Sequence, residues 1–212
     1  MSIELDHLVI GARTLEEGAQ WVFARLGAMP AGGGKHPLMG THNRVLRLGE
    51  QAYLEVLAID PEAPAPGRPR WFGLDSPEMQ TRLEEGPALI HWVARTDDIE
   101  RDARAAPVHM GQILDVSRGD LRWRITVPRE GALPRDGIFP TFIQWQGRHP
   151  AAALPDSNCQ LESLQLFHPR AAGLLAALRH LGLSADAPVA ATDGEAHLMA
   201  HVRTPGGVVT LP

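Results

Sequence analysis

The chain has 212 residues, of which 44% are hydrophobic and 21% are charged, and its formal net charge is −5. These values are typical of a globular protein with one large domain, or with two small modules that share a core. The acidic balance argues against nucleic acid or an anionic membrane as the main partner. No apolar run approaches the ~18 residues that would indicate a membrane span.

Two further features predict the cellular compartment. The N-terminus leads directly into an expected strand that carries Glu4 and Asp6, which is unlike a signal peptide. The single cysteine, Cys159, cannot form an internal disulfide. A reducing cytoplasm is therefore expected.

Residues 1–60 predict a first module that begins with a strand at 5–10. Thr14 and the glutamate three residues later have the spacing of a capping box at the start of a helix. After a glycine-rich stretch, which includes one more short strand, segments 44–48 and 51–59 are expected to pair as a hairpin. The predicted order is βαβββ.

The same order of elements begins again at residues 88–147, after a proline-rich linker loop at residues 61–87. A third, partial βαββ module is expected at residues 148–212, with a helix from Pro169 and short strands from Pro188 onwards. Because a partial module cannot bury both of its faces, we expect it to dock on the sheet of the first two. The predicted class is α+β, with all three parts in one compact unit.

The repeat places polar side chains at matching positions in the two complete modules. His7 and His91 lie in the first strand of each module, and Glu55 and Gln144 lie in the last. A carboxylate such as Glu55 within an apolar strand is costly unless it is paired, hydrogen-bonded or bound to a metal. This pattern resembles the vicinal-oxygen-chelate superfamily, whose members pair two βαβββ modules into a half-open cup of mixed sheet.

The chain resembles one branch of that superfamily, the glyoxalase-like domain family, more closely. Its members share a DHLV strand, a GG-x-HP-x-x-GT-x-N loop and a YLE-x-x-x-x-D strand, which correspond here to residues 6–9, 33–43 and 53–60. Residues 122–124 and 142–145 also resemble the second half of this family. The fold supports lyases, epimerases, dioxygenases, thiol transferases and binding proteins, so the resemblance predicts the architecture better than the reaction.

The resemblance implies a divalent-metal site formed by His7, Glu55, His91 and Gln144. Two imidazoles and a carboxylate suit Zn, Ni, Mn or Fe(II), and residue types alone do not choose among these metals. Gln144 is the weakest member, because amides are poor metal ligands.

Each of these side chains also has a structural interpretation. Either histidine could be a core residue whose ring is satisfied by a backbone carbonyl. Glu55 could form a buried salt bridge with Arg44, Arg47 or an arginine of the second module.

The function predicted from the resemblance is that of a metal-dependent lyase or isomerase that acts on a small molecule with two neighbouring oxygens. The metal would act as a Lewis acid, and Glu55 or His36 would transfer the proton. His36, Asn43, Arg122 and Arg124 are the candidates for substrate binding. If the two arginines instead face solvent, they form a polar face and the tryptophan between them is core.

Two alternative functions stay open. Two histidines and a glutamate resemble the facial triad of Fe(II) dioxygenases, but ring-cleaving members of the superfamily carry their glutamate where this chain has Gln144. The other alternative is a binding protein without catalysis, which would sequester a small molecule in the cup. A small-molecule ligand is expected in every case, and a homodimer is one arrangement open to the fold.

Overall fold

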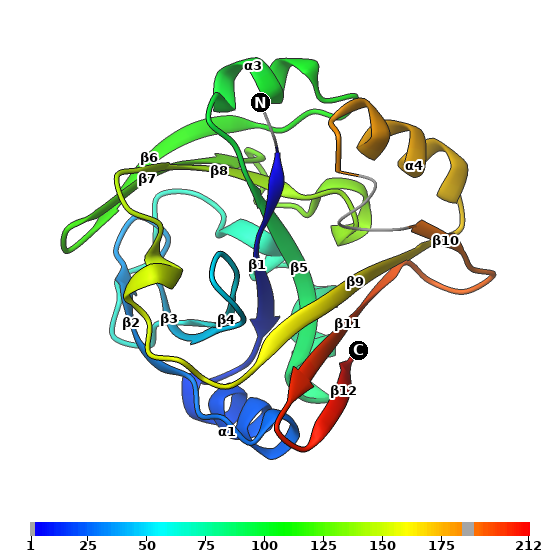
Figure 1. The fold of residues 1–212 in the computed structure, drawn as a ribbon. Coiled ribbons are helices and arrows are strands. Elements are labelled where there is room, and N and C mark those ends of the chain that lie inside the picture. The colour runs from blue at the N-terminus through cyan, green and yellow to red at the C-terminus, as the bar shows by residue number, and fades with distance from the viewer. Residues whose placement is uncertain (1–2, 184–188) are drawn as a thin grey trace.

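The computed structural model describes residues 3–183 and 189–212, which form two β-sheets with helices packed around them (Figure 1). The larger sheet has eight strands in the order β2-β3-β4-β1-β5-β8-β7-β6, and the smaller has the order β10-β9-β11-β12. No helix in this described part combines the length and apolar character needed to cross a membrane.

The first module has the predicted βαβββ order. Its elements are β1 (Glu4–Gly11), α1 (Leu15–Leu26), β2 (Ala31–His36), β3 (Thr41–Arg47) and β4 (Tyr53–Ile59). The hydroxyl of Thr14 accepts a hydrogen bond from the backbone N–H of Glu17 at 3.1 Å, as the capping-box spacing predicts. Gly27 ends the helix with a left-handed φ of 68°, which glycine adopts without steric cost.

The second module repeats this order after a connection that contains η1 (Trp71–Gly73) and α2 (Pro77–Glu84). Its elements are β5 (Ala88–Arg95), α3 (Ile99–Ala105), β6 (Gln112–Arg118), β7 (Leu121–Val127), η2 (Pro134–Gly137), β8 (Thr141–Gln146) and η3 (Pro150–Ala153). The cap of α3 is Asp98, whose carboxylate accepts from the N–H of Arg101.

The two modules join within one chain because β1 pairs antiparallel with β5. Each module contributes half of a curved sheet, and the two outer strands, β2 and β6, approach each other across the opening. The result is a nearly closed cup of mixed sheet, as predicted for an α+β fold with paired βαβββ modules, and β1 and β5 lie at its centre (Figure 1). Side chains that point into this cup come from both modules.

The third module comprises β9 (Gln160–His168), α4 (Ala171–His180), β10 (Val189–Ala191), β11 (His197–Thr204) and β12 (Gly207–Leu211). Pro188, where a strand was predicted to begin, lies outside the described residues. Three short strands follow its helix, in agreement with the short strands predicted for this segment, and its first strand pairs with the strand after the helix rather than with its last strand. Leu164 and Leu166 of β9 share a core with Leu8 and Trp92, so the module docks on the large sheet as predicted.

Candidate functional site

The cup encloses a small cavity of about 30 Å³ that both modules line. Its polar side chains are those of His7, His36, Asn43, Glu55 and Arg118. Aromatic rings form much of the remaining wall: Tyr53, Trp71, Phe72, Trp123 and Trp145. A cavity of this size admits about two waters or one small functional group.

A β-bulge in the first strand brings two neighbouring polar residues to the cup. The pairing of β1 with β5 shifts register between Leu5 and His7, which leaves Asp6 as the extra residue. Leu5 therefore packs against the hydrophobic cluster that contains Leu8 and Trp92, whereas His7 lines the cavity. Strict alternation along a strand would place both side chains on the same face of the sheet. A bulge can redirect side chains in this way next to a functional site.

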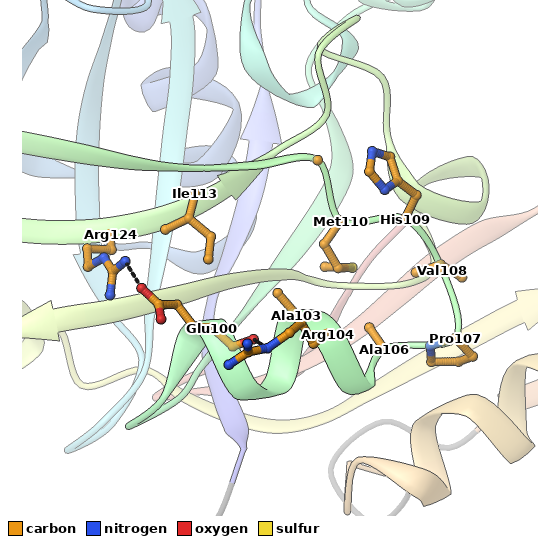
Figure 2. Close-up of a pocket in the computed structure, with 11 residues that line it drawn as sticks. Glu100, Ala103, Arg104, Ala106, Pro107, Val108, His109, Met110, Ile113 and Arg124 are labelled. Carbon is orange, nitrogen blue, oxygen red and sulfur yellow. Dashed lines mark hydrogen bonds and ion pairs between the residues drawn. The ribbon is translucent and has the colours of Figure 1, made fainter.

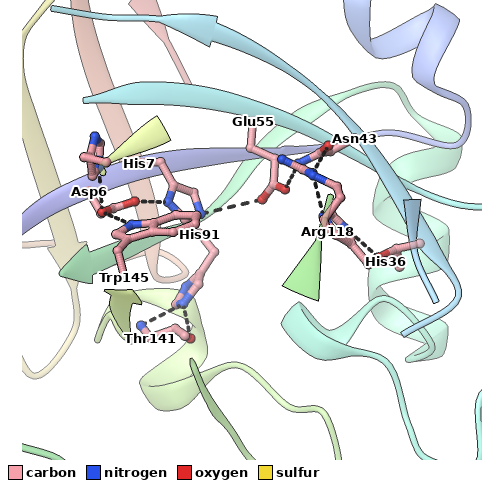
Figure 3. Close-up of polar contacts among 11 residues, drawn as sticks. Asp6, His7, His36, Asn43, Glu55, His91, Arg118, Thr141 and Trp145 are labelled. Carbon is pink, nitrogen blue, oxygen red and sulfur yellow. Dashed lines mark hydrogen bonds and ion pairs between the residues drawn. The ribbon is translucent and has the colours of Figure 1, made fainter. Parts of the chain in front are cut away.

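Asp6 is fully buried and accepts three hydrogen bonds from neighbouring rings (Figure 3). Its carboxylate accepts from Nδ1 of His7 at 2.6 Å, and from Nε1 of Trp145 and Nε2 of His149, both at 2.9 Å. Burial alone would raise the pKa of Asp6, but the hydrogen bonds from His149 and His7 outweigh it and hold this pKa well below its usual range. Because an ionised carboxylate only accepts, His7 carries a proton on Nδ1, and its Nε2 faces the cavity.

Glu55 faces that free nitrogen across the cavity. Its Oε2 lies 3.6 Å from Nε2 of His7, and its Oε1 accepts a hydrogen bond from the amide of Asn43 at 2.5 Å (Figure 3). The Glu55 residue is only 6% exposed. The arrangement is a chain of carboxylate, imidazole and carboxylate, Glu55–His7–Asp6, which suits proton transfer.

Arg118 closes the cup from the second module. Its guanidinium extends from the end of β6 and donates to Nε2 of His36 at 2.9 Å and to Oδ1 of Asn43 at 2.6 Å (Figure 3). The other ring nitrogen of His36 contacts the hydroxyl of Thr41 at 3.1 Å. Burial, and then the charge of Arg118, lower the pKa of His36 to about 3, so this ring is neutral and its lone pair is already engaged.

His91 lies in β5 with both nitrogens already bonded. Its Nδ1 donates to the carbonyl of Gly137 at 2.9 Å, and its Nε2 accepts from the hydroxyl and the N–H of Thr141 at 2.9 and 3.1 Å. Burial lowers its pKa to about 3, although the bond to Gly137 acts in the opposite direction. No lone pair of His91 is left for a metal.

Gln144 points away from the cup. Its amide donates to the carbonyl of Asp97 at 2.5 Å and accepts from the N–H of Ile99 at 3.4 Å, at the start of α3. Its neighbours Ile143 and Trp145 line the cavity instead, because side chains alternate along β8.

The four predicted ligands therefore do not converge on one point. Of that set, only His7 and Glu55 face each other, and no group of three or more His, Cys, Asp or Glu side chains in the described ranges is arranged to hold a metal ion. The residues present do not fit the predicted four-ligand site.

The two arginines predicted to bind substrate also lie outside the cup, and Trp123 between them lines it. Arg122 is exposed, and Arg124 forms an ion pair with Glu100 at 2.6 Å. Arg124 lines a separate groove of about 880 Å³ between α3 and β6 (Figure 2). Residues at i and i+2 of a strand share a face, so both arginines leave the cup together.

Three residues of the site, Asp6, Trp71 and Arg118, are not among those that the sequence predicted for it. Asp6 lies in the DHLV strand and Trp71 in the proline-rich connection, and no sequence motif marks Arg118. The adjacent Asp6 and His7 were a usable indication of a carboxylate–imidazole pair, but only the bulge brings both side chains to one network.

The comparisons with known proteins agree with this architecture. The family model of the glyoxalase-like domain matches residues 5–182. The chain belongs to this family. A hypothetical protein from Staphylococcus aureus has the same fold, with a TM-score of 0.61 at 13% identity over 99% of this chain and 84% of its own. No curated protein sequence matches the chain.

More distant similarity reaches two epimerases. The methylmalonyl-CoA epimerase of Mycobacterium tuberculosis is 17% identical over 71% of this chain and 92% of its own, with a TM-score of 0.42. An enzyme of the same name from Streptomyces coelicolor is 17% identical over 69% of this chain and 100% of its own, with a TM-score of 0.45. At TM-scores this low, neither enzyme carries an argument about the reaction of this glyoxalase-like protein.

Proposed function

We propose that the cup binds a small oxygenated molecule and moves a proton on it, in the manner of an isomerase or lyase. The observation that supports this function is the Glu55–His7–Asp6 chain, in which a nearly buried carboxylate lies 3.6 Å from Nε2 of an imidazole ring. A site that excludes water strengthens every electrostatic interaction within it.

Glu55 would act as the base. One of its oxygens accepts the proton of a C–H bond next to a carbonyl group, the electron pair of that bond forms a C=C bond, and the π electrons of the carbonyl group move onto its oxygen to give an enolate. Nε2 of His7 can then take the proton from Glu55, and the ionised Asp6 stabilises the resulting imidazolium. Return of the proton to the same or a neighbouring atom completes an isomerisation.

His36, the other candidate for proton transfer, is less suited to this role. Its Nε2 accepts from Arg118, and its pKa of about 3 makes it a weak base. We assign it the role of orienting the guanidinium.

The proposal can be tested by hydrogen exchange. The protein would be incubated in D₂O with pyruvate, hydroxyacetone or lactate, and deuterium uptake would be followed by ¹H NMR. We expect protein-dependent exchange in at least one of these probes, its loss in Glu55→Gln, and a reduction of at least about tenfold in His7→Gln. Exchange that persists in Glu55→Gln at the wild-type rate would contradict the assignment of the base.

The second candidate function is that of a binding protein without catalysis. It is favoured by the aromatic wall and by the failure of the predicted metal ligands to converge. Saturable binding of a probe without any exchange would support it. The predicted Fe(II) dioxygenase receives no such support, since its facial triad needs the lone pair of His91 that Thr141 occupies. The cytoplasmic location stays a prediction.

A further inference from the structure

Arg118 is a half-buried cation that has no carboxylate partner among residues 3–183 and 189–212. Its NH1 donates only to neutral acceptors, the ring of His36 and the amide oxygen of Asn43. Among the described residues, six other arginines form ion pairs with carboxylates: Arg44, Arg70, Arg95, Arg101, Arg124 and Arg203. A guanidinium in a cavity wall with unused donors is suited to bind an anion.

Asn43 prevents this cation from pairing with Glu55. Its Oδ1 accepts from Arg118 and from the N–H of Gly34, which fixes the orientation of the amide, and its Nδ2 donates to Glu55. The amide thus lies between the two opposite charges. Gly34 also leaves room for the arginine, because a Cβ there would lie 2.8 Å from Cδ of Arg118.

Trp71 supplies a second donor without a partner. Its ring lines the same cavity and packs edge-on against His36, with the ring centroids 5.1 Å apart. The residue is 3% exposed, yet its indole N–H finds no acceptor in the described part of the chain. A buried donor without an acceptor is costly, and a ligand oxygen would remove this cost.

We propose that Arg118 and Trp71 bind the carboxylate of a small monoanionic ligand. A planar carboxylate matches the fork of a guanidinium, and it is small enough for the cavity of about 30 Å³. A dianion such as phosphate would meet only one cation and would lie close to the carboxylate of Glu55. This inference deepens the proposed function and rests on it in one respect: the C–H bond that reaches Glu55 belongs to the molecule whose carboxylate Arg118 and Trp71 bind.

The test uses pairs of probes that differ only in charge, acetate with acetamide and lactate with lactamide. Their dissociation constants would be measured by NMR titration on the full chain. We expect each carboxylate to bind at least about tenfold more tightly than its amide, as for a charge-assisted hydrogen bond. Arg118→Gln should remove this preference, Arg118→Lys should restore part of it, and the exposed Arg129→Gln should leave it unchanged.

Trp71→Phe separates ligand binding from a structural role. This variant keeps a ring in the wall and removes only the donor, so it should weaken acetate binding several-fold without lowering the melting temperature. Equal affinity for acetate and acetamide in the wild type would overturn the inference, as would a charge preference that survives in Arg118→Gln.

The two proposals can fail separately. Glu55→Gln removes the base and should keep or strengthen acetate binding, because it also removes a nearby carboxylate. Carboxylate binding without exchange in any probe would leave the inference standing and overturn the proposed reaction. If hydroxyacetone, which is neutral, exchanged its hydrogens and Arg118→Gln had no effect on acetate binding, the proposed reaction would stand and the inference of a carboxylate site would be overturned.

Discussion

The two modules have the same order of elements, yet their equivalent first-strand histidines do different things. His7 is held on one side by Asp6 and keeps its other nitrogen free towards Glu55. His91 is held on both sides, by Gly137 and by Thr141, and has no free nitrogen. The same residue type at a repeated position therefore does not have the same chemical role, because the hydrogen-bond partners of each ring decide whether a nitrogen stays available.

Acid should produce the largest effect, because it acts on two buried rings at once. His36 and His91 have pKa values of about 3 in the folded protein, below the usual value of 6.5. Between these values the unfolded chain binds more protons, so stability falls as the pH is lowered from about 6.5 towards 3. The expected loss is roughly 3 kcal/mol per ring by pH 4.

Urea unfolding at several pH values measures this loss. His91→Gln should remove about half of this loss, whereas the exposed His109→Gln should leave the profile unchanged. A profile that is flat from pH 7 to 4 in the wild type would contradict the burial of these rings in neutral form.

Replacement of Asp6 should have the next largest effect. Asp6→Asn keeps the volume but removes the charge that accepts from three rings, and we expect a loss of roughly 3 kcal/mol in the free energy of unfolding. Proton exchange should fall as well, because His7 would no longer be held in the Nδ1–H form. Asp115→Asn, at an exposed site, is the matched control. Equal stability of the two variants would show that the Asp6 network is not formed.

The two histidines can be compared directly by removing each ring. His91→Ala should lower the free energy of unfolding by about 2 kcal/mol, since it leaves the Gly137 carbonyl and the Thr141 donors without partners. His7→Ala should cost less stability, because Asp6 keeps two donors, but it should abolish exchange. Urea unfolding and the NMR exchange assay together check this contrast. If both variants lost hydrogen exchange on the probe and both kept the wild-type free energy of unfolding, the two histidines would have the same role, and the contrast between the modules would be wrong.

Gln144 should give the smallest effect. Gln144→Ala removes two hydrogen bonds at the partly exposed start of α3, with an expected cost of about 1 kcal/mol or less. Binding of acetate and proton exchange should not change. A change of either by more than about twofold would place this side chain in the site after all.

The fold was predictable from the sequence because its determinants are local. Capping residues such as Thr14, the left-handed Gly27 and the alternation of apolar residues mark the elements, and the order of elements repeats. The pairing of the third module was not predictable from that order. Its first strand takes as parallel neighbour the strand directly after the helix, an arrangement that the first two modules do not use and that no local pattern indicates.

Only the part of the site that the first module contributes was predictable from the sequence. The sequence determined that His7 and Glu55 lie on strands of one module, and β1 pairs with β4 so that both can face one cavity. Tertiary structure decided the rest. A bulge at Asp6 changes which side chains share a face, and strand alternation places Trp145 rather than Gln144 in the cup. Arg118 reaches Asn43 across 75 positions of sequence, because the outer strands of the sheet close on each other. Such contacts depend on the register between paired strands and on the closure of the sheet into a cup, and no local sequence pattern encodes either.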